Sequence, residues 1–165
     1  MTDEALWGSH LPVLMAALAT SVGPVVEFGI GHFSTPCLHA VCMSTERHLF
    51  SVEQNPEWFK MFADTFSTEN HGFLLGEYLD MIDRLPTKIG LAFIDHSPGG
   101  QSRAEVFAKM ILRADYVVVH DYHHENEEFI APLLGGLQTY VTRRYQPPTL
   151  IASMNFALPP GLSRL

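Results

Sequence analysis

The stretch from Val25 to Ser34 most constrains what this chain can fold into, because it has the pattern of a buried strand that ends in an acid and two glycines and continues into a helix. The β-branched residues and the phenylalanine of Val25–Phe28 are typical of a strand that is covered on both faces. Gly29 and Gly31 allow the backbone to bend sharply and to lie close to another group. A ligand is the natural candidate for that group.

A second predicted strand, Leu49–Val52, follows after a spacing of about 20 residues and ends at Glu53. A glycine-containing turn followed by an acid at the tip of the neighbouring strand is how an open α/β sheet holds a nucleoside at the carboxyl ends of its strands. The two segments together therefore indicate a nucleoside-binding sheet.

Strands and helices alternate along the chain, which predicts a mostly parallel sheet. Further strands are expected at residues 71–75, 89–94 and 116–119, and an antiparallel pair is expected at residues 138–145 and 149–154. The predicted fold class is α/β. It is a single-domain, Rossmann-like three-layer sandwich over residues 1–165, with a mostly parallel sheet of about seven strands and a C-terminal antiparallel hairpin.

Polar residues that can cap helices mark the expected helix starts. Ser9 is a candidate cap for a helix with Pro12 in its first turn, and Ser34 or Thr35 is a candidate for the helix after the glycine turn. Asn55 is expected to cap the next helix. The aromatic residues of that helix are expected in the core, and they are Trp58, Phe59, Phe62 and Phe66.

Composition narrows the classes of function. The chain has 165 residues, of which 47% are hydrophobic and 17% charged, so it should fold around a core. Its formal net charge of −8 opposes binding to nucleic acid or to an anionic membrane, because both need a basic surface. A small-molecule substrate is therefore favoured. The acidic N-terminus lacks the lysines of a signal peptide, and no apolar run approaches the roughly 20 residues of a membrane span, so the cytoplasm is the expected compartment.

The two cysteines, Cys37 and Cys42, fall in one predicted helix. They lie too far around that helix for an easy disulfide, and two cysteines are too few for a zinc site. We expect both to be buried small apolar residues.

Polar residues follow four of the first five predicted strands, and they are Glu27, Glu53, Asp95 with His96, and His120 with Asp121. The carboxyl ends of parallel strands share one edge of the sheet, where open α/β sheets bind their ligands. Solvation alone poorly explains such residues after four strands. We therefore expect these side chains to form a binding site.

Glu27 discriminates between the possible ligands. The segment from Gly29 to Ser34 approaches the dinucleotide-binding pattern G-x-G-x-x-G, but Ser34 stands where a glycine or alanine lets the helix and strand pack closely. The carboxylate before the first glycine would also lie near a pyrophosphate, and like charges at short range in a partly dry cleft are unfavourable. A cationic ligand is favoured, and S-adenosylmethionine offers a sulfonium and an ammonium group without a phosphate.

Together these residues resemble class I S-adenosylmethionine-dependent methyltransferases. The likeness comprises, in chain order, Glu27-x-Gly29-x-Gly31, Glu53, Asp95-His96 and Asp121. In that family the glycine turn holds the methionine part of the cofactor, the acid after the second strand binds the ribose hydroxyls, and residues after the third and fourth strands approach the adenine. The resemblance implies that S-adenosylmethionine is bound by Glu27, Gly29, Gly31, Glu53, Gln54, Asp95 and His96.

Within that family, the segments that contain Asp95 and Asp121 look most like the catechol type, in which acids after the fourth and fifth strands bind a magnesium ion that orients two adjacent hydroxyls. The resemblance implies a Mg²⁺ site at Asp95 and Asp121. The chain departs from that type at two positions, because Tyr122 replaces its asparagine ligand and Pro98 replaces its lysine base. Mg²⁺ requires several oxygen ligands, and this set of ligands is small.

Methyl transfer is a direct displacement, so the protein mainly has to align the acceptor and remove its proton. The candidate catalytic residues are Asp95, His96, His120 and Asp121, and His123 is a further candidate in the same loop region. Histidine has an ordinary pKa near 6.5, so a base is available without a metal. The sequence does not choose among these groups.

Four hypotheses follow. The first is a methyltransferase that acts on an oxygen or nitrogen of a small molecule, with an acceptor site that is either open or closed by a second subunit in a homo-oligomer. The second is a catalytically inactive S-adenosylmethionine-binding module that acts through partner contacts. The third is a metal-dependent hydrolase that uses the segment His120–His124 together with Asp95. An NAD-linked oxidoreductase is the fourth, and Glu27 and Ser34 disfavour it.

Overall fold

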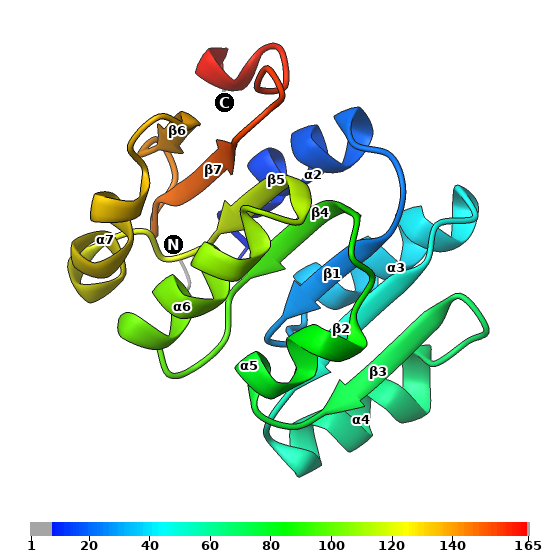
Figure 1. The fold of residues 1–165 in the computed structure, drawn as a ribbon. Coiled ribbons are helices and arrows are strands. Elements are labelled where there is room, and N and C mark those ends of the chain that lie inside the picture. The colour runs from blue at the N-terminus through cyan, green and yellow to red at the C-terminus, as the bar shows by residue number, and fades with distance from the viewer. Residues whose placement is uncertain (1–7, 165) are drawn as a thin grey trace.

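The sheet at the centre of the molecule contains seven strands, and helices cover both of its faces (Figure 1). The computed structural model describes residues 8–164. The strands are β1 (Val25–Phe28), β2 (Leu49–Glu53), β3 (His71–Leu75), β4 (Ile89–Ile94), β5 (Ala114–Val119), β6 (Gln138–Thr142) and β7 (Thr149–Ser153). The α-helices are α2 (Leu11–Thr20), α3 (Ser34–Ser44), α4 (Pro56–Phe66), α5 (Tyr78–Met81), α6 (Gln101–Met110) and α7 (His124–Ile130).

The strand order is β3-β2-β1-β4-β5-β7-β6. The pairs from β3 to β5 are parallel, whereas β7 runs antiparallel to both β5 and β6. The predicted α/β class, the mostly parallel seven-stranded sheet and the C-terminal hairpin are confirmed. The strand order reverses between β1 and β4, and ligands of open α/β sheets bind beyond the carboxyl ends of the strands at such a switch point.

Side chains of the central strands alternate between two apolar clusters, one on each face of the sheet. Val25 and Phe93 pack with residues of α2 and α3. Val26, Phe28 and Ile94 pack with residues of α6, which Figure 1 shows on the side of the sheet opposite α3. Every residue of β1 and β4 is buried, and burial on both faces explains the apolar runs that mark these strands in the sequence.

One of the three predicted helix caps is confirmed. Asn55 caps α4, because its side chain accepts hydrogen bonds from the backbone amides of Glu57 and Trp58. Ser9 does not cap α2 and neither Ser34 nor Thr35 caps α3, since each helix begins after a residue without a side-chain cap. The physical reason is tertiary. The hydroxyl of Ser9 donates to the carbonyl of Pro147, and that of Thr35 donates to Glu27.

The predicted aromatic core of α4 is confirmed only in part. Phe62 is buried, but Trp58 is half exposed and its indole Nε1 donates to the carbonyl of Ile30 at 2.6 Å. Trp58 therefore holds the turn after β1 instead of filling the core. The cysteines form no disulfide within residues 8–164, and Cys42 is buried as predicted, whereas Cys37 is partly exposed.

None of the helices in the described part of the chain is long and apolar enough to cross a bilayer. The N-terminal acids on which the expectation of no signal peptide rests belong to residues 1–7, which lie outside the described range.

Candidate functional site

Two adjoining clefts of about 470 and 450 Å³ lie at the carboxyl ends of β1, β2, β4 and β5. Ile30, Trp58 and Asp95 line both, so the clefts share a wall. We call the cleft that also contains Glu53 the Glu53 cleft, and the one that also contains His120 the His120 cleft. The structure brings the predicted site residues to these two clefts, with the exception of Glu27. The Glu53 cleft is lined by Gly29, Glu53, Gln54 and His96. The His120 cleft is lined by Gly31, His120 and Asp121, and Asp95 lines both clefts.

Glu53 ends β2 and is held in place by the backbone around it. One carboxylate oxygen accepts from the amides of Gln54 and Asn55 at 2.9 and 2.8 Å, and the other accepts from the amide of Ile30 at 3.2 Å. The Tyr78 hydroxyl donates at 3.3 Å to the same oxygen as Gln54 and Asn55. The acid is therefore fixed before any ligand arrives, and it lies on the wall of the Glu53 cleft.

His96 forms a flat wall of the same cleft, and neither of its ring nitrogens has a hydrogen-bond partner among residues 8–164. Its ring stacks on Tyr78 with centroids 4.0 Å apart, and only 1% of the residue is exposed. Burial lowers the pKa of His96 to about 3, so the imidazole is neutral at physiological pH. A neutral imidazole with so low a pKa is a weak base, and the catalytic role of His96 stays a prediction. A group that is too weak a base at pH 7 serves better as a stacking surface.

Gly29 is the residue at which the turn after β1 meets the loop after β4. Its φ is +88°, a conformation that residues with a side chain rarely adopt. A Cβ atom at this position would lie 2.6 Å from His96 Cα and 2.7 Å from the carbonyl carbon of Asp95. The group that lies close to Gly29 is therefore the backbone of Asp95 and His96. This contact places the turn after β1 against residues that line the two clefts.

Glu27 lies beneath the glycine turn and outside both clefts. No part of its surface is exposed. Its carboxylate accepts from Thr35 Oγ1 at 3.0 Å and from Ser51 Oγ at 2.6 Å, and Thr35 Oγ1 in turn accepts from the amide of Gly31 at 3.0 Å. The prediction that this carboxylate faces a cationic ligand is corrected by its position. Glu27 supports the turn, and burial raises the pKa of Glu27 to about 7.

The hydrogen bonds around Glu27 continue to a buried histidine. Ser51 uses its hydroxyl hydrogen for Glu27, so it accepts from Nε2 of His71 at 3.0 Å. Nδ1 of His71 then accepts from Nδ1 of His39 at 3.0 Å. We call Glu27, Thr35, Ser51 and His71 the closed cluster, because each side chain in it has its hydrogen-bond partners within the protein.

A second group of polar side chains surrounds Asp95 in the His120 cleft. One oxygen of Asp95 lies 3.2 Å from the guanidinium of Arg103, and the other lies 3.1 Å from Nδ1 of His120. Burial opposes ionisation of Asp95, but His120 and Arg103 outweigh it and lower the pKa of this carboxyl. Arg103 is buried, and it also donates to the backbone carbonyls of His96 and His120.

Ser9 fixes which nitrogen of His120 carries a proton. Its single hydroxyl hydrogen is donated to the carbonyl of Pro147 at 2.8 Å. The 2.9 Å contact between Ser9 Oγ and His120 Nε2 therefore needs the proton on Nε2. Nδ1, which faces the carboxylate of Asp95, consequently needs either a second proton on the ring or another cation between the two atoms.

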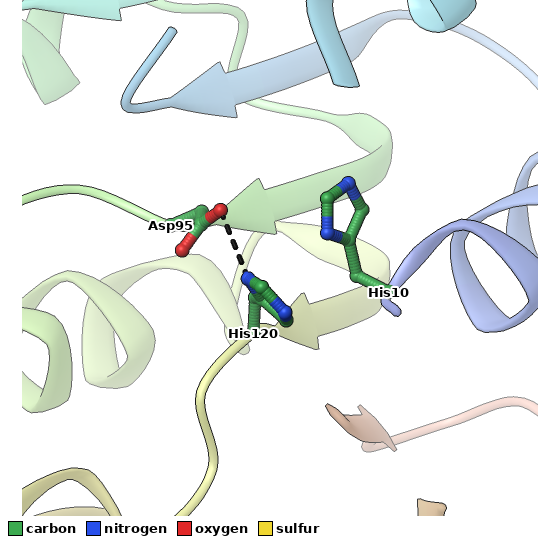
Figure 2. Close-up of side chains that lie close together, drawn as sticks. All are labelled: His10, Asp95 and His120. Carbon is green, nitrogen blue, oxygen red and sulfur yellow. Dashed lines mark hydrogen bonds and ion pairs between the residues drawn. The ribbon is translucent and has the colours of Figure 1, made fainter. Parts of the chain in front are cut away.

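His10, at the start of α2, completes this group (Figure 2). Its ring packs on Phe93 and meets His120 edge to face, with centroids 4.9 and 4.5 Å apart. His10 is 2% exposed, and neither ring nitrogen has a hydrogen-bond partner among residues 8–164. Burial lowers the pKa of His10 to about 4. We call His10, Asp95 and His120 the open cluster.

The predicted magnesium pair of Asp95 and Asp121 does not fit the structure. Arg103 lies between the two acids, 3.2 Å from an oxygen of Asp95 and 3.9 Å from one of Asp121, and supplies the positive charge that a cation would otherwise bring. Mg²⁺ prefers an octahedron of oxygen ligands. The group of potential ligands that the structure does form contains two imidazoles and one carboxylate, with Asp121 outside it.

Sequence reasoning missed three residues of the site. Tyr78 and Arg103 reach it from helices whose sequence carries no motif, although Arg103 is a lone basic residue shortly after the Asp95 loop. His10 had no signal at all, because it precedes the first strand and joins the site only when α2 packs against β4 and β5.

Comparison with known proteins bears on the fold. No family model matches the sequence, and no curated protein matches it. Three solved structures illustrate the structural likeness. Cofactor-bound Rv0187 from MTB has a TM-score of 0.69 and 17% identity, and the match covers 95% of this chain and 82% of that one. The SAH-bound methyltransferase PaMTH1 from Podospora anserina has a TM-score of 0.68 and 10% identity, with 88% of this chain and 76% of that one covered. Precorrin-6y C5,15-methyltransferase from Geobacter metallireducens has a TM-score of 0.65 and 17% identity, with 86% of this chain and 84% of that one covered. The chain has the Rossmann-like fold of these three structures, two of which are methyltransferases, and at such identities the likeness concerns the fold alone.

Proposed function

We propose that this chain is an S-adenosylmethionine-dependent methyltransferase that acts on an oxygen or nitrogen of a small molecule. The observation that carries the proposal is the pair of clefts that meet at Asp95. One has the fixed acid at the end of β2 that a nucleoside needs, and the other has polar side chains around the position where an acceptor would lie. The fold that the chain shares with two solved methyltransferases supports this assignment.

In this proposal the Glu53 cleft holds the nucleoside. Glu53 accepts hydrogen bonds from the ribose hydroxyls, and the stacked rings of His96 and Tyr78 provide a flat aromatic surface for the base. The turn at Gly29 and Gly31 holds the methionine part near Asp95. When bound, S-adenosylmethionine supplies a methyl group on a positively charged sulfur.

The protein's own task is then to orient the acceptor and remove its proton. Among the four predicted catalytic residues, Asp121 has the most accessible side chain, at 32% exposed, and it lines the His120 cleft. His120 has contacts at both ring nitrogens, and both oxygens of Asp95 are engaged. We therefore assign proton removal to Asp121, with Asp95, His120 and Arg103 fixing its surroundings.

Calorimetric titration of the full chain with S-adenosylmethionine, S-adenosylhomocysteine and NAD tests the binding step. Both adenosyl compounds should bind more tightly than NAD, because Ser34 stands where the dinucleotide-binding pattern has a glycine or alanine. Glu53→Ala should weaken binding by roughly 1.5–3 kcal/mol, as expected for the loss of a hydrogen bond to a charged group. The control is Glu57→Ala, which removes an exposed acid from the first turn of α4 and should leave binding unchanged. Preferential binding of NAD would overturn the proposal.

Transfer of a labelled methyl group to a panel of small hydroxyl and amine compounds tests the chemistry. Asp121→Asn should reduce transfer by about 10²–10⁴-fold while cofactor binding is retained. Tight cofactor binding by the wild-type protein without transfer to any acceptor would instead support the inactive binding module.

A further inference from the structure

We propose that His10, Asp95 and His120 bind a divalent transition-metal ion of the class that includes Zn²⁺ and Co²⁺. Figure 2 shows the three side chains converging from different parts of the chain, His10 from the start of α2, Asp95 after β4 and His120 after β5. The proposal does not depend on methyl transfer, since it concerns a binding site within the protein itself.

The spacing of the potential ligand atoms suits such an ion. One atom from each of the three side chains can be chosen so that all lie within 4.8 Å of one another. Two ligands at about 2.0–2.1 Å from a tetrahedral metal lie roughly 3.3–3.4 Å apart. Nδ1 of His120 and the facing oxygen of Asp95 are already 3.1 Å apart, so these two ligands need little movement to bind an ion.

The proton assignment on His120 gives a second reason. Because Ser9 requires a proton on Nε2, Nδ1 of the neutral ring directs a lone pair at a carboxylate oxygen. Two electron-rich atoms at this distance repel unless a cation lies between them. A metal ion beside Nδ1 fulfils this role and leaves Nε2–H bonded to Ser9, and a partner on the second nitrogen is the usual arrangement for histidine ligands of metals.

The cation between His120 and Asp95 could be a proton or a metal ion, and the surroundings of His10 favour the metal ion. A proton shared by His120 and Asp95 needs no third group, and it leaves both nitrogens of His10 buried without a partner among residues 8–164. An unpartnered buried polar group costs free energy, so its presence at the wall of the cleft calls for a ligand. A metal ion bound by all three side chains satisfies His10 as well.

The surroundings of the cluster define the class of metal. Two imidazoles and one carboxylate are the ligand set of many zinc sites and of other first-row transition metals, whereas Mg²⁺ selects oxygen ligands. Arg103 contacts the second oxygen of Asp95 at 3.2 Å, so Asp95 binds through one oxygen only. The three ligands also line the His120 cleft, so the remaining coordination positions face the place proposed for the acceptor.

Metal binding can be measured without cofactor or acceptor. The full chain, freed of metal with a chelator and then dialysed, should bind one equivalent of Co²⁺ and give the visible absorption of a low-symmetry site, and Zn²⁺ should displace it. His10→Ala and His120→Ala should each weaken Co²⁺ binding by more than the roughly 10–100-fold that follows loss of an outer partner. Thermal unfolding of each variant without metal checks that it folds.

The control is His124→Asn, which removes an exposed histidine from the first position of α7, where φ is +49°, a value that asparagine tolerates. This variant should bind Co²⁺ like the wild-type protein. The proposal is overturned if the wild-type protein binds no stoichiometric Co²⁺, or if His124→Asn weakens binding while His10→Ala does not. A failed cofactor titration in the presence of chelator would contradict the proposed function and leave this result unaffected.

Ser9 acts as a positioning residue in this site. Ser9→Ala removes the partner of His120 Nε2 and should weaken Co²⁺ binding about 10–100-fold, and Ser9→Thr should restore it. If both variants bound Co²⁺ as tightly as the wild-type protein, the proton assignment that supports the site would be wrong.

Discussion

Two groups of polar side chains, one beneath the glycine turn and one in the His120 cleft, differ in how their hydrogen bonds are satisfied. In the closed cluster, Glu27, Thr35, Ser51 and His71 form a chain of bonds beneath the glycine turn. In the open cluster, His10 has no partner within residues 8–164, and Asp95 and His120 face one another across a position that needs a cation.

The difference separates a structural role from a binding role. Buried polar groups with complete hydrogen bonding stabilise one arrangement of the chain, and those of the closed cluster fix the turn that contains Gly31. Buried groups with unmet hydrogen-bonding capacity reduce stability, and each calls for an explanation such as a bound water, an ion or a functional role. Burial alone does not distinguish the two groups, because Glu27 and His10 are both nearly inaccessible.

The largest expected effect on the free energy of unfolding comes from Gly29, which packs against the backbone of Asp95 and His96. Gly29→Ala should lower the free energy of unfolding by more than about 4 kcal/mol, because the added Cβ meets the backbone of Asp95 and His96 and neither can move freely. Denaturant unfolding monitored by circular dichroism measures the loss.

Gly136→Ala is a matched control for this substitution. Gly136 has a similar φ of +81°, but nothing lies within 4 Å of its added Cβ. The control should lose only about 1–2 kcal/mol, the cost of the left-handed conformation. Equal losses in the two variants would show that backbone strain, and not the contact between the turn and the Asp95 loop, makes Gly29 necessary.

The closed cluster should make stability depend on pH through Glu27. The pKa of Glu27 is raised from 4.5 to about 7 by burial, so the folded protein holds this proton more tightly than the unfolded chain. The resulting stabilisation is complete below pH 4.5 and is lost as the pH rises through about 7. The loss should amount to roughly 3 kcal/mol.

Glu27→Gln isolates this contribution, because the buried histidines titrate in both proteins and cancel in the difference. Wild-type and variant proteins should be compared by urea unfolding between pH 4 and pH 8, about the range in which Glu27 and the buried histidines titrate. The wild-type protein should lose stability relative to the variant across this interval. A constant difference would mean that Glu27 keeps an ordinary pKa, and the closed cluster would then contain a buried charge.

The sequence predicted the strands and the edge at which the polar residues gather, because both follow from local patterns. Apolar runs mark β1, β4 and β5, and a polar residue directly after a parallel strand must lie at its carboxyl end. Asn55 was also predictable, since a cap needs only its own helix.

The direction of a side chain at that edge was not predictable in the same way. Glu27 lies within β1, and the alternation of the strand directs it to the face covered by α3, where Thr35 binds it. Glu53 ends its strand and reaches a cleft. His10 depends on tertiary packing entirely, because no spacing in the sequence links the start of α2 to the ends of β4 and β5.

The smallest expected effects test the comparison most directly. Replacement of a histidine by phenylalanine should lower the free energy of unfolding in the closed cluster and raise it in the open cluster. His71→Phe removes the partner of Ser51 and His39 and should lower the free energy of unfolding by roughly 2–3 kcal/mol. His10→Phe removes two nitrogens that have no partner among residues 8–164 from a site beside Phe93, and it should raise the free energy of unfolding by about 1 kcal/mol. Both are measured by urea unfolding with a chelator present, because a bound metal would stabilise the wild-type protein alone. Destabilisation by His10→Phe in chelator would mean that this ring already has its partners in the folded protein, and the contrast between the closed and open clusters would no longer hold.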